Sequence, residues 1–347
     1  MEAFTKERKG RLGQLVGAGT LAVGLALNPL AATNPAEAGT KFILANVVDK
    51  QHVMHVAATA FSKKLDELSG GNIEVEYHLG GDLGDWVELF EQTMQGSIEM
   101  TQTWNASEFD KRLDLATLGY TVDTYEDGRQ AFGPGGPMAG FWAEVFADLN
   151  MKLVGILPDG FYGIVVRKGV DAPKMFPADA KGFKLRVPPI KIGVVRFEAL
   201  GFSAIPMPGS ELYTAMQLGQ VDGAAFRPAN EAIGMTDIMD HYVRTNDIFG
   251  YSFWLANKDW WEGLSDADRG MIEKASTHAV NAAWDEFPSI DNKAVEGVKA
   301  AGVQVHNLTA DELAAAKKIV YAEEWPWMEE QLGKETMDKV RSAIGAQ

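Results

Sequence analysis

The sequence predicts an α/β protein that is built as two lobes. Short apolar, β-branched runs alternate along the chain with longer segments whose apolar residues recur at helical spacing. This alternation is present in both halves, and no low-complexity linker separates them. A length of 347 residues is sufficient for two lobes with buried cores. We therefore expect two α/β lobes with mostly parallel sheets, joined by strands that cross between them.

The first half is expected to contain three strands and two helices. Residues Lys41 to Val48 form an apolar run that is typical of a buried strand, and a helix follows from His55 to Ser69. The alternating residues from Asn72 to His78 predict a half-exposed strand. A helix from Trp86 to Met94 and a short strand from Glu99 to Trp104 complete this half.

The second half repeats the alternation and ends in helices. Its predicted strands are 152–157, 162–167, 182–187, 204–206 and 221–226. Its predicted helices are 191–200, 210–218, 262–300 with an interruption near Pro288, and the C-terminal helices within 310–346.

Two short motifs resemble functional sites but have ordinary structural explanations. The segment Gly133 to Gly140 is glycine-rich like a phosphate-binding loop, yet it lacks the GxGxxG order, and its two prolines remove N–H donors. We interpret it as a turn before the helix that contains Phe141 and Trp142. The pair His52-x-x-His55 has a spacing that suits a metal, but further ligands are not evident, and surface histidines at a helix start explain it better.

The first 38 residues have the features of an export signal. A basic segment precedes a largely apolar one, 12–30, and the small-x-small cleavage pattern of Ala36-Glu37-Ala38 follows. The basic residues are Lys6, Arg8, Lys9 and Arg11. The apolar segment could also be a membrane anchor, but its glycines and the cleavage pattern favour removal. We expect a mature protein that begins near Gly39 and is free in the periplasm.

Charge and composition argue against several classes of function. A formal net charge of −16 opposes binding to nucleic acid and to anionic membranes. The absence of cysteine excludes thiol catalysis, disulfides and cysteine-ligated zinc. No serine-hydrolase, zinc-protease or kinase signature is present. We therefore expect a binding protein without cofactor or metal, and a secreted hydrolase is the weaker alternative.

Arg186 is the first candidate for a binding residue. It lies in the apolar strand segment Lys184 to Pro189, where its planar guanidinium could bind a carboxylate or sulfonate through two hydrogen bonds. The alternative is a structural arginine that pairs with an internal acid.

Several long segments resemble the DctP-type binding proteins of tripartite ATP-independent periplasmic (TRAP) transporters. They are KLRVPP, FEALGFSAIPMP, SELYTAMQLGQVDG, LANKDWWEGLSDADR and, upstream, LDELSGGNIEVEYHLGGDLGDWVELFEQTMQGSIEM. The resemblance covers essentially the whole mature chain, and its central part is specific.

This resemblance implies a periplasmic-binding-protein (flytrap) fold with hinge strands and a long crossing helix. Lobe 1 would comprise residues 39–162 and 252–290, and lobe 2 residues 163–251 and 292–347. A small organic ligand would bind between the lobes, and closure would bury it. The transporter's membrane subunits would then take up the ligand with a sodium gradient. We expect the binding protein to be a monomer.

The resemblance also implies roles for individual residues. Arg186 matches the family's carboxylate-binding arginine. Tyr162 stands where many members have a second arginine, which argues against a dicarboxylate. Phe226 replaces a ligand-binding asparagine next to two alanines, which argues against a polyhydroxylated sugar acid. Arg227 is the open question, because a second cation in the site would restore a dianionic ligand.

An aromatic pair is the remaining feature of the predicted site. Trp104 and Phe226 could face each other across it, as in the similar ectoine-binding members, and attract a cation, although core packing would also explain both. Asn46, Asp49 and Asp247 are candidates to meet a positive or hydroxyl group. We expect a monocarboxylate, a sulfonate or an ectoine-like or amino-acid-like zwitterion, with a dicarboxylate or sugar acid as the alternative.

Overall fold

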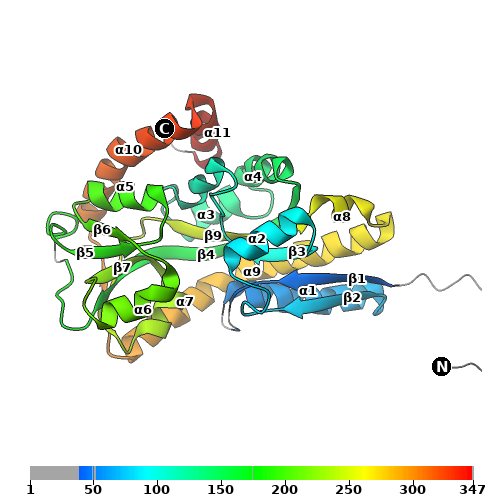
Figure 1. Cartoon of the computed structure of the whole chain (residues 1–347), viewed down its shortest axis with the longest axis horizontal. Helices are drawn as coiled ribbons and strands as arrows, with labels where there is room; N and C mark the ends of the chain where they lie inside the picture. The colour runs from blue at the N-terminus through cyan, green and yellow to red at the C-terminus, as the bar shows by residue number, and fades with distance from the viewer. Residues whose placement is uncertain (1–38, 49, 51, 174, 346–347) are drawn as a thin grey trace, which may run out of the picture. The chain divides into compact units, whose positions relative to one another are not determined.

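A ten-stranded mixed sheet forms the centre of the fold (Figure 1). The computed structural model describes residues 39–345 except residues 49, 51 and 174, so the predicted export segment lies outside the described residues. The strands are β1 (Thr40–Ala45), β2 (Ile73–His78), β3 (Met100–Thr103), β4 (Met151–Arg167), β5 (Lys184–Val187), β6 (Ser203–Pro206), β7 (Gly223–Pro228), β8 (Met239–Arg244), β9 (Phe249–Asn257) and β10 (Gln304–Asn307).

Helices pack on this sheet and connect its strands. They are α1 (Val53–Ser69), α2 (Trp86–Gln95), α3 (Tyr125–Phe132), α4 (Pro137–Asp148), α5 (Lys191–Ala199), α6 (Gly209–Gln217), α7 (Ala229–Ala232), α8 (Lys258–Gly263), α9 (Asp266–Ala300), α10 (Ala310–Leu332) and α11 (Lys334–Ile344), with 3-10 turns at Lys111–Thr117 and Ile233–Met235. The glycine-rich segment from Gly133 onward connects α3 to α4, as predicted.

The sheet has two regions that share strand β4. In the first region the order is β2-β1-β3-β9-β4, and in the second β7, β5 and β6 continue from β4, which also pairs with β8. Strand β4 pairs with β9 from Met151 to Phe161 and with β7 and β8 from Tyr162 onward. The outer strands are parallel to one another within each region (β1, β2 and β3 in the first; β5, β6 and β7 in the second), whereas the central strands β4 and β9 run antiparallel to their neighbours. The prediction of parallel α/β units joined by crossing strands is therefore confirmed.

Strand β4 is longer than the sequence predicts. The segments 152–157 and 162–167 were expected as separate strands, but they form one strand of 17 residues, so the predicted break was wrong. The register shifts between Pro158 and Gly160, and Gly160 takes a φ of 85° that suits glycine. The bulge keeps the strand continuous and places Asp159 in its middle.

Helix α9 runs along both regions of the sheet (Figure 1). It contacts α1 and β4, and it also contacts α7 and β10. The predicted interruption near Pro288 was wrong, because the helix is 35 residues long and includes this proline. An interior proline costs about 3 kcal/mol, and the buried side chains of Trp284 and Phe287 just before it help to offset that cost.

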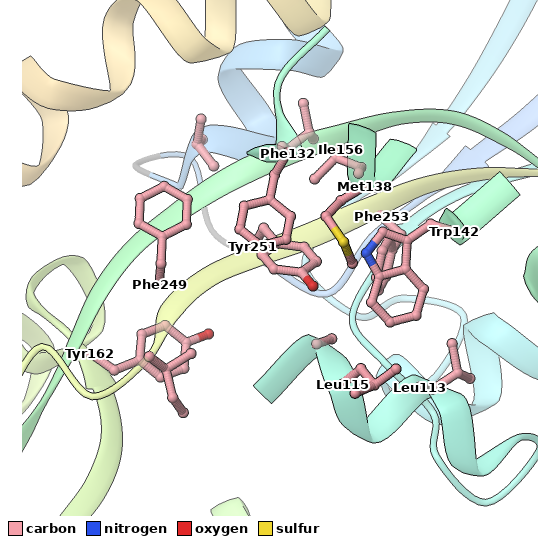
Figure 2. Packing of buried hydrophobic residues seen from close by; sticks show 14 of the residues in the cluster. Leu113, Leu115, Phe132, Met138, Trp142, Ile156, Tyr162, Phe249, Tyr251 and Phe253 are labelled. Carbon is pink, nitrogen blue, oxygen red and sulfur yellow. The ribbon is translucent and has the colours of Figure 1, made fainter. Parts of the chain in front are cut away.

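An aromatic cluster fixes the crossing strands to α3 and α4 (Figure 2). The rings of Phe132 and Tyr251 stack with centroids 4.3 Å apart, and Trp142 contacts Phe253 edge-on at 5.0 Å. Each buried side chain of this size contributes about 1.5–3 kcal/mol. The cluster therefore packs α3 and α4 firmly against β9. No helix in the described part of the chain is long and apolar enough to cross a membrane.

Candidate ligand-binding site

Arg186 is buried in β5 without a complete set of partners. The residue is only 2% exposed. Its Nε donates to the carbonyl oxygen of Met207 at 2.9 Å, but its Nη1 is buried and has no hydrogen-bond partner among the described residues. Burial, followed by repulsion from Arg227, lowers the pKa of Arg186 to about 9, and Glu231 opposes this effect. An acid bound at Nη1 would supply the missing acceptor and counter-charge.

Phe226 has a backbone conformation that is unusual for a bulky residue. Its φ is 60°, in the region that favours glycine. Gly163 pairs with Arg227 and Val165 pairs with Ala224, so two residues of β7 lie opposite one residue of β4. A bulky residue held in this conformation costs on the order of 1–3 kcal/mol and is typical of functional sites.

The ring of Phe226 packs between residues of several elements. Its centroid lies 6.2 Å from that of Tyr162 and 6.2 Å from that of Phe197. The guanidinium of Arg196 lies 5.7 Å from the same ring. A Cβ on Gly193 would approach the ring to 3.0 Å, so glycine is needed there to admit it. The unusual backbone therefore places a closely packed ring next to Tyr162.

Asp159 binds three side chains from three different elements. His52 Nε2 lies 3.0 Å from Oδ1, while Trp104 Nε1 and Tyr162 Oη donate to Oδ2 at 3.1 and 2.9 Å. The carboxylate is fully buried. Burial opposes its charge, but His52 and the hydrogen bonds of all three partners outweigh burial and lower the pKa of Asp159. Asp159 is therefore a buried anion that holds two of the predicted site residues in place.

Arg227 is paired within its own segment. Its Nη1 donates to Oε2 of Glu231 at 2.7 Å, one helical turn later in α7. Burial raises the pKa of Glu231, which also interacts electrostatically with Arg186, Asp159 and His52. Because Glu231 balances the charge of Arg227, Arg186 is left as the cation of this group without an ion-pair partner among the described residues.

These residues form one group, which we call the β4 cluster. It consists of His52, Trp104, Asp159, Tyr162, Arg186, Phe226, Arg227 and Glu231. Its members come from both regions of the sheet and meet around the middle of β4. The structure thus brings together five of the predicted site residues: Trp104, Tyr162, Arg186, Phe226 and Arg227.

Two of the other predicted residues, Asn46 and Asp247, make their contacts outside the β4 cluster. Asn46 is fully buried, and its Nδ2 donates to Gln102 at 3.0 Å. The carboxylate of Asp247 accepts from Arg196 at 3.0 Å and from Thr245. Asp49 lies outside the described residues.

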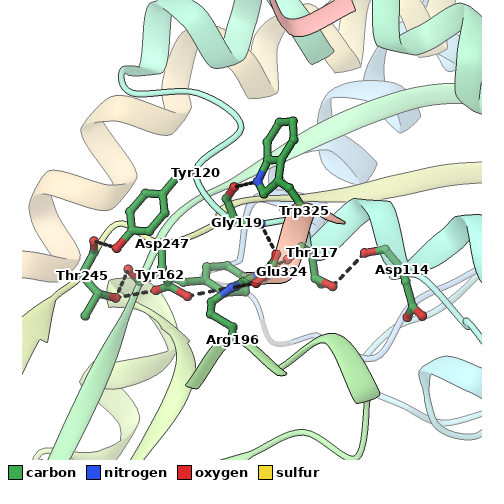
Figure 3. A network of polar contacts seen from close by, with 10 residues as sticks. All are labelled: Asp114, Thr117, Gly119, Tyr120, Tyr162, Arg196, Thr245, Asp247, Glu324 and Trp325. Carbon is green, nitrogen blue, oxygen red and sulfur yellow. Dashed lines mark hydrogen bonds and ion pairs between the residues drawn. The ribbon is translucent and has the colours of Figure 1, made fainter. Parts of the chain in front are cut away.

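Asp247 belongs to a buried ionic network around Arg196 (Figure 3). Arg196 Nε donates to Glu324 Oε2 at 2.6 Å, and its Nη2 donates to Glu324 Oε1 at 2.8 Å. The backbone N–H of Gly119 also donates to Oε1, at 2.7 Å. Burial raises the pKa of Glu324 and opposes the charge of Arg196, whose pKa is nevertheless raised by Glu324 and Asp247. We assign an ionised pair, because three N–H donors reach the carboxylate.

Sequence reasoning missed three members of the β4 cluster. Asp159 was hidden in a Pro-Asp-Gly segment that predicts a turn, and Glu231 lies in a short helix that carries no pattern. His52 was predicted to be a surface histidine at a helix start; it does begin α1, where its Nδ1 accepts from the N–H of Met54 at 3.2 Å, but the prediction of a surface position was wrong because the residue is buried. An acid within an otherwise apolar strand was the available signal for Asp159.

The buried Arg186, which has an unsatisfied nitrogen, belongs to a group of polar and aromatic side chains from both regions of the α/β sheet, and this arrangement suits the binding of a small acidic solute. In the described chain, no group of three or more histidine, aspartate or glutamate residues could hold a metal ion. Comparison with known proteins gives the family.

The model of the family described as bacterial extracellular solute-binding protein, family 7 (DctP), matches residues 44–326. The chain belongs to this family, whose members include binding proteins of TRAP transporters. It is 27% identical over 343 residues to the C4-dicarboxylate-binding periplasmic protein DctP of Rhodobacter capsulatus, covering 96% of this chain and 97% of the relative.

Solved structures share the two-lobed fold. A TRAP periplasmic solute-binding protein from Ochrobactrum anthropi, with its C-terminus bound in the ligand-binding pocket, matches with a TM-score of 0.81 and 24% identity, over 88% of this chain and 95% of that one. The periplasmic ectoine-binding protein of the TeaABC TRAP transporter of Halomonas elongata matches with a TM-score of 0.79 and 20% identity, over 88% and 99%. The predicted fold class is confirmed.

Proposed function

We propose that this protein captures a small organic acid with a single acidic group in the periplasm and delivers it to the membrane subunits of a sodium-coupled TRAP transporter. The proposed lobes are residues 39–162 with 252–290, and 163–251 with 292–347. The ligand would be a monocarboxylate, a sulfonate or an ectoine-like or amino-acid-like zwitterion. It would bind at the β4 cluster, where residues of both lobes meet.

The observation that carries this proposal is the state of Arg186. A guanidinium nitrogen that is buried without a partner is costly, and a bound carboxylate or sulfonate would remove that cost. An arginine with only a structural role would be expected to pair with an internal acid, as Arg196 does with Glu324.

The charges of the cluster favour one acidic group on the ligand. Arg227 is already balanced by Glu231, and Tyr162 binds Asp159 in place of a second cation. A dianion would have one uncompensated end next to buried carboxylates, which is unfavourable. The relatives differ among themselves: one is named for C4-dicarboxylates and another for ectoine. The side chains of this chain therefore decide our choice.

A thermal-shift screen tests the ligand class. Monocarboxylates, zwitterions, sulfonates, dicarboxylates and sugar acids are each added to the purified protein. We expect a rise in unfolding temperature with members of the first three classes. A rise confined to dicarboxylates or sugar acids would contradict the ligand class, and consumption of a ligand with turnover would contradict the binding function.

Calorimetry on Arg186 variants tests the residue. Arg186→Ala should weaken binding of the best ligand by about 30-fold or more, equivalent to about 2–5 kcal/mol, because a charge-assisted contact is lost. Arg186→Lys should also bind poorly, since a point charge does not replace the planar fork. Unchanged affinity in Arg186→Ala would contradict the proposed site.

A further inference from the structure

Asp159 lies in the middle of β4 and connects Trp104 and Tyr162 within the β4 cluster. It is fully buried at the β4 bulge and accepts from an indole N–H and a phenol O–H. Because Trp104 and Tyr162 point their polar atoms at this carboxylate, the carbon parts of both rings extend away from it. The carboxylate thus sets the orientation of two aromatic residues from different elements.

The same carboxylate is a fixed negative charge. The ring nitrogen Nδ1 of His52 accepts from the N–H of Met54, which assigns the ring proton to Nε2 and a donor role toward Asp159. Because Nδ1 accepts a hydrogen bond, this geometry assigns a neutral ring to His52, and the hydrogen bonds from His52, Trp104 and Tyr162 keep Asp159 ionised. A ligand group that contacts the ring of Trp104 or Tyr162 would therefore be separated from the Asp159 carboxylate only by that ring.

The neighbouring residues do not reverse this charge. Arg227 and Glu231 form a pair, and Arg186 is the group proposed to bind the acid of the ligand. Once that acid is bound, the ligand acid and Arg186 balance each other, and Asp159 remains as a buried anion. A positive group on the ligand would restore neutrality in the closed site and would interact favourably with the aromatic rings.

We propose that Asp159 is the specificity-determining residue of the site: it holds Trp104 and Tyr162 and selects zwitterions, whose positive group lies at the end remote from Arg186. This inference rests on the proposed function and narrows its ligand class. Asp159 acts through the two aromatic residues and through its charge, so it is a positioning residue and need not touch the ligand.

Isosteric ligand pairs test the charge preference directly. Glycine betaine and 3,3-dimethylbutanoate have the same shape and carboxylate but differ in the charge of the bulky end, as do L-proline and cyclopentanecarboxylate in the ring. Dissociation constants are measured by calorimetry for wild type, Asp159→Asn and Asp110→Asn. Asp110 pairs with Arg112, outside the β4 cluster, and serves as a control with the same change of net charge.

For wild type and Asp110→Asn we expect at least one zwitterion to bind about tenfold or more tightly than its uncharged isostere. In Asp159→Asn this ratio should fall toward one, because asparagine keeps the shape but not the charge. A general loss of structure would weaken both members of a pair and leave their ratio unchanged. Tyr162→Phe, which keeps the ring but loses the contact to Asp159, provides a second variant and should also lower the ratio.

The outcomes separate this inference from the proposed function. Equal wild-type affinity for the two members of each pair overturns the inference and leaves a monoacid-binding protein. An unchanged ratio in a folded Asp159→Asn protein overturns the role of Asp159. If dicarboxylates bind and none of the four probes does, both the inference and the proposed ligand class are overturned.

Discussion

Arg186 and Arg196 are equally buried, but they have opposite electrostatic environments. Arg186 is 2% exposed and has a buried Nη1 without a partner, whereas Arg196 is fully buried between Glu324 and Asp247. Replacing each arginine by methionine, which has a similar length and no charge, should therefore change the stability of the ligand-free protein in opposite directions.

The structure gives a magnitude for Arg186→Met. The pKa of this guanidinium falls from 12.5 to about 9, and at about 1.36 kcal/mol for each pH unit the difference corresponds to a charge-burial cost on the order of 5 kcal/mol. Removing the charge should stabilise the protein by this amount, but loss of the hydrogen bond to Met207 leaves a carbonyl oxygen unsatisfied and destabilises the protein by about 1–3 kcal/mol. We expect a net stabilisation of about 2–4 kcal/mol.

The control variant, Arg196→Met, should be less stable than wild type. Arg196→Met leaves Glu324 and Asp247 as buried carboxylates without their cation, which typically costs about 3–5 kcal/mol. The assay is urea unfolding of both ligand-free variants, followed by far-UV circular dichroism, together with a thermal shift in the presence of the best ligand. Arg186→Met should have a raised midpoint and no response to ligand.

A destabilised Arg186→Met protein would refute the reasoning. A loss of about 2 kcal/mol or more would mean that the charge of Arg186 is satisfied inside the protein, as that of Arg196 is. Arg186 would then be a structural residue, and the binding site would have to be sought elsewhere.

Three further predictions concern the residues around Arg186. Phe226→Gly should lower stability by less than the roughly 3–5 kcal/mol that is usual for removing a buried phenylalanine, because glycine adopts the φ of 60° without strain. The same variant should bind ligand at least about tenfold more weakly. Phe226→Ala, measured by the same urea and calorimetry experiments, should be less stable than Phe226→Gly. A Cβ at position 250 would overlap the ring of Tyr162, so Gly250→Ala should lower the unfolding free energy in urea by about 1–3 kcal/mol and weaken ligand binding. The control Gly140→Ala has open space around it in α4 and should be neutral or stabilising. The pKa of Asp159 is lowered in the folded state, so its ionisation stabilises the fold above its unfolded pKa of about 4, and this contribution is lost as pH falls through the folded value. The difference in unfolding free energy between wild type and Asp159→Asn should therefore shrink in unfolding curves recorded below about pH 4. A difference that stays constant with pH would contradict the assignment.

Local patterns predicted the elements whose hydrophobic period is clear. Helices α1, α2 and α5 and strands β1 and β2 agree with the sequence to within a few residues. Strand β9 was missed, although every one of its residues is buried, because Gly250 and Ser252 interrupt its apolar residues. The break in β4 was predicted wrongly because Pro-Asp-Gly favours a turn when it is isolated, and pairing with β9 on both sides of this segment overrides that preference.

The site could be predicted only where one residue type carries the chemistry. Arg186 and Phe226 stand out from their strand context and from the family motifs, and the structure places both in the β4 cluster. The partners of Asp159 come from positions 52, 104 and 162, which no local pattern connects. Asp247 was a reasonable acid to consider, but its pairing with Arg196 depends on tertiary structure alone.

The pair formed by Arg196 and Glu324 spans 128 residues of sequence and has a consequence for the order in which the fold can be completed. A chain that has emerged only as far as β9 contains Arg196 and Asp247 but not the bidentate carboxylate of α10. Arg196 would then lack the two hydrogen bonds that it donates to Glu324, so we expect this region to remain open until α10 is present. We propose that the chain crosses a membrane before it folds. Stable structure would then have to wait until α10, which carries Glu324, has also crossed. Removal of α10 should accordingly leave a protein that does not fold.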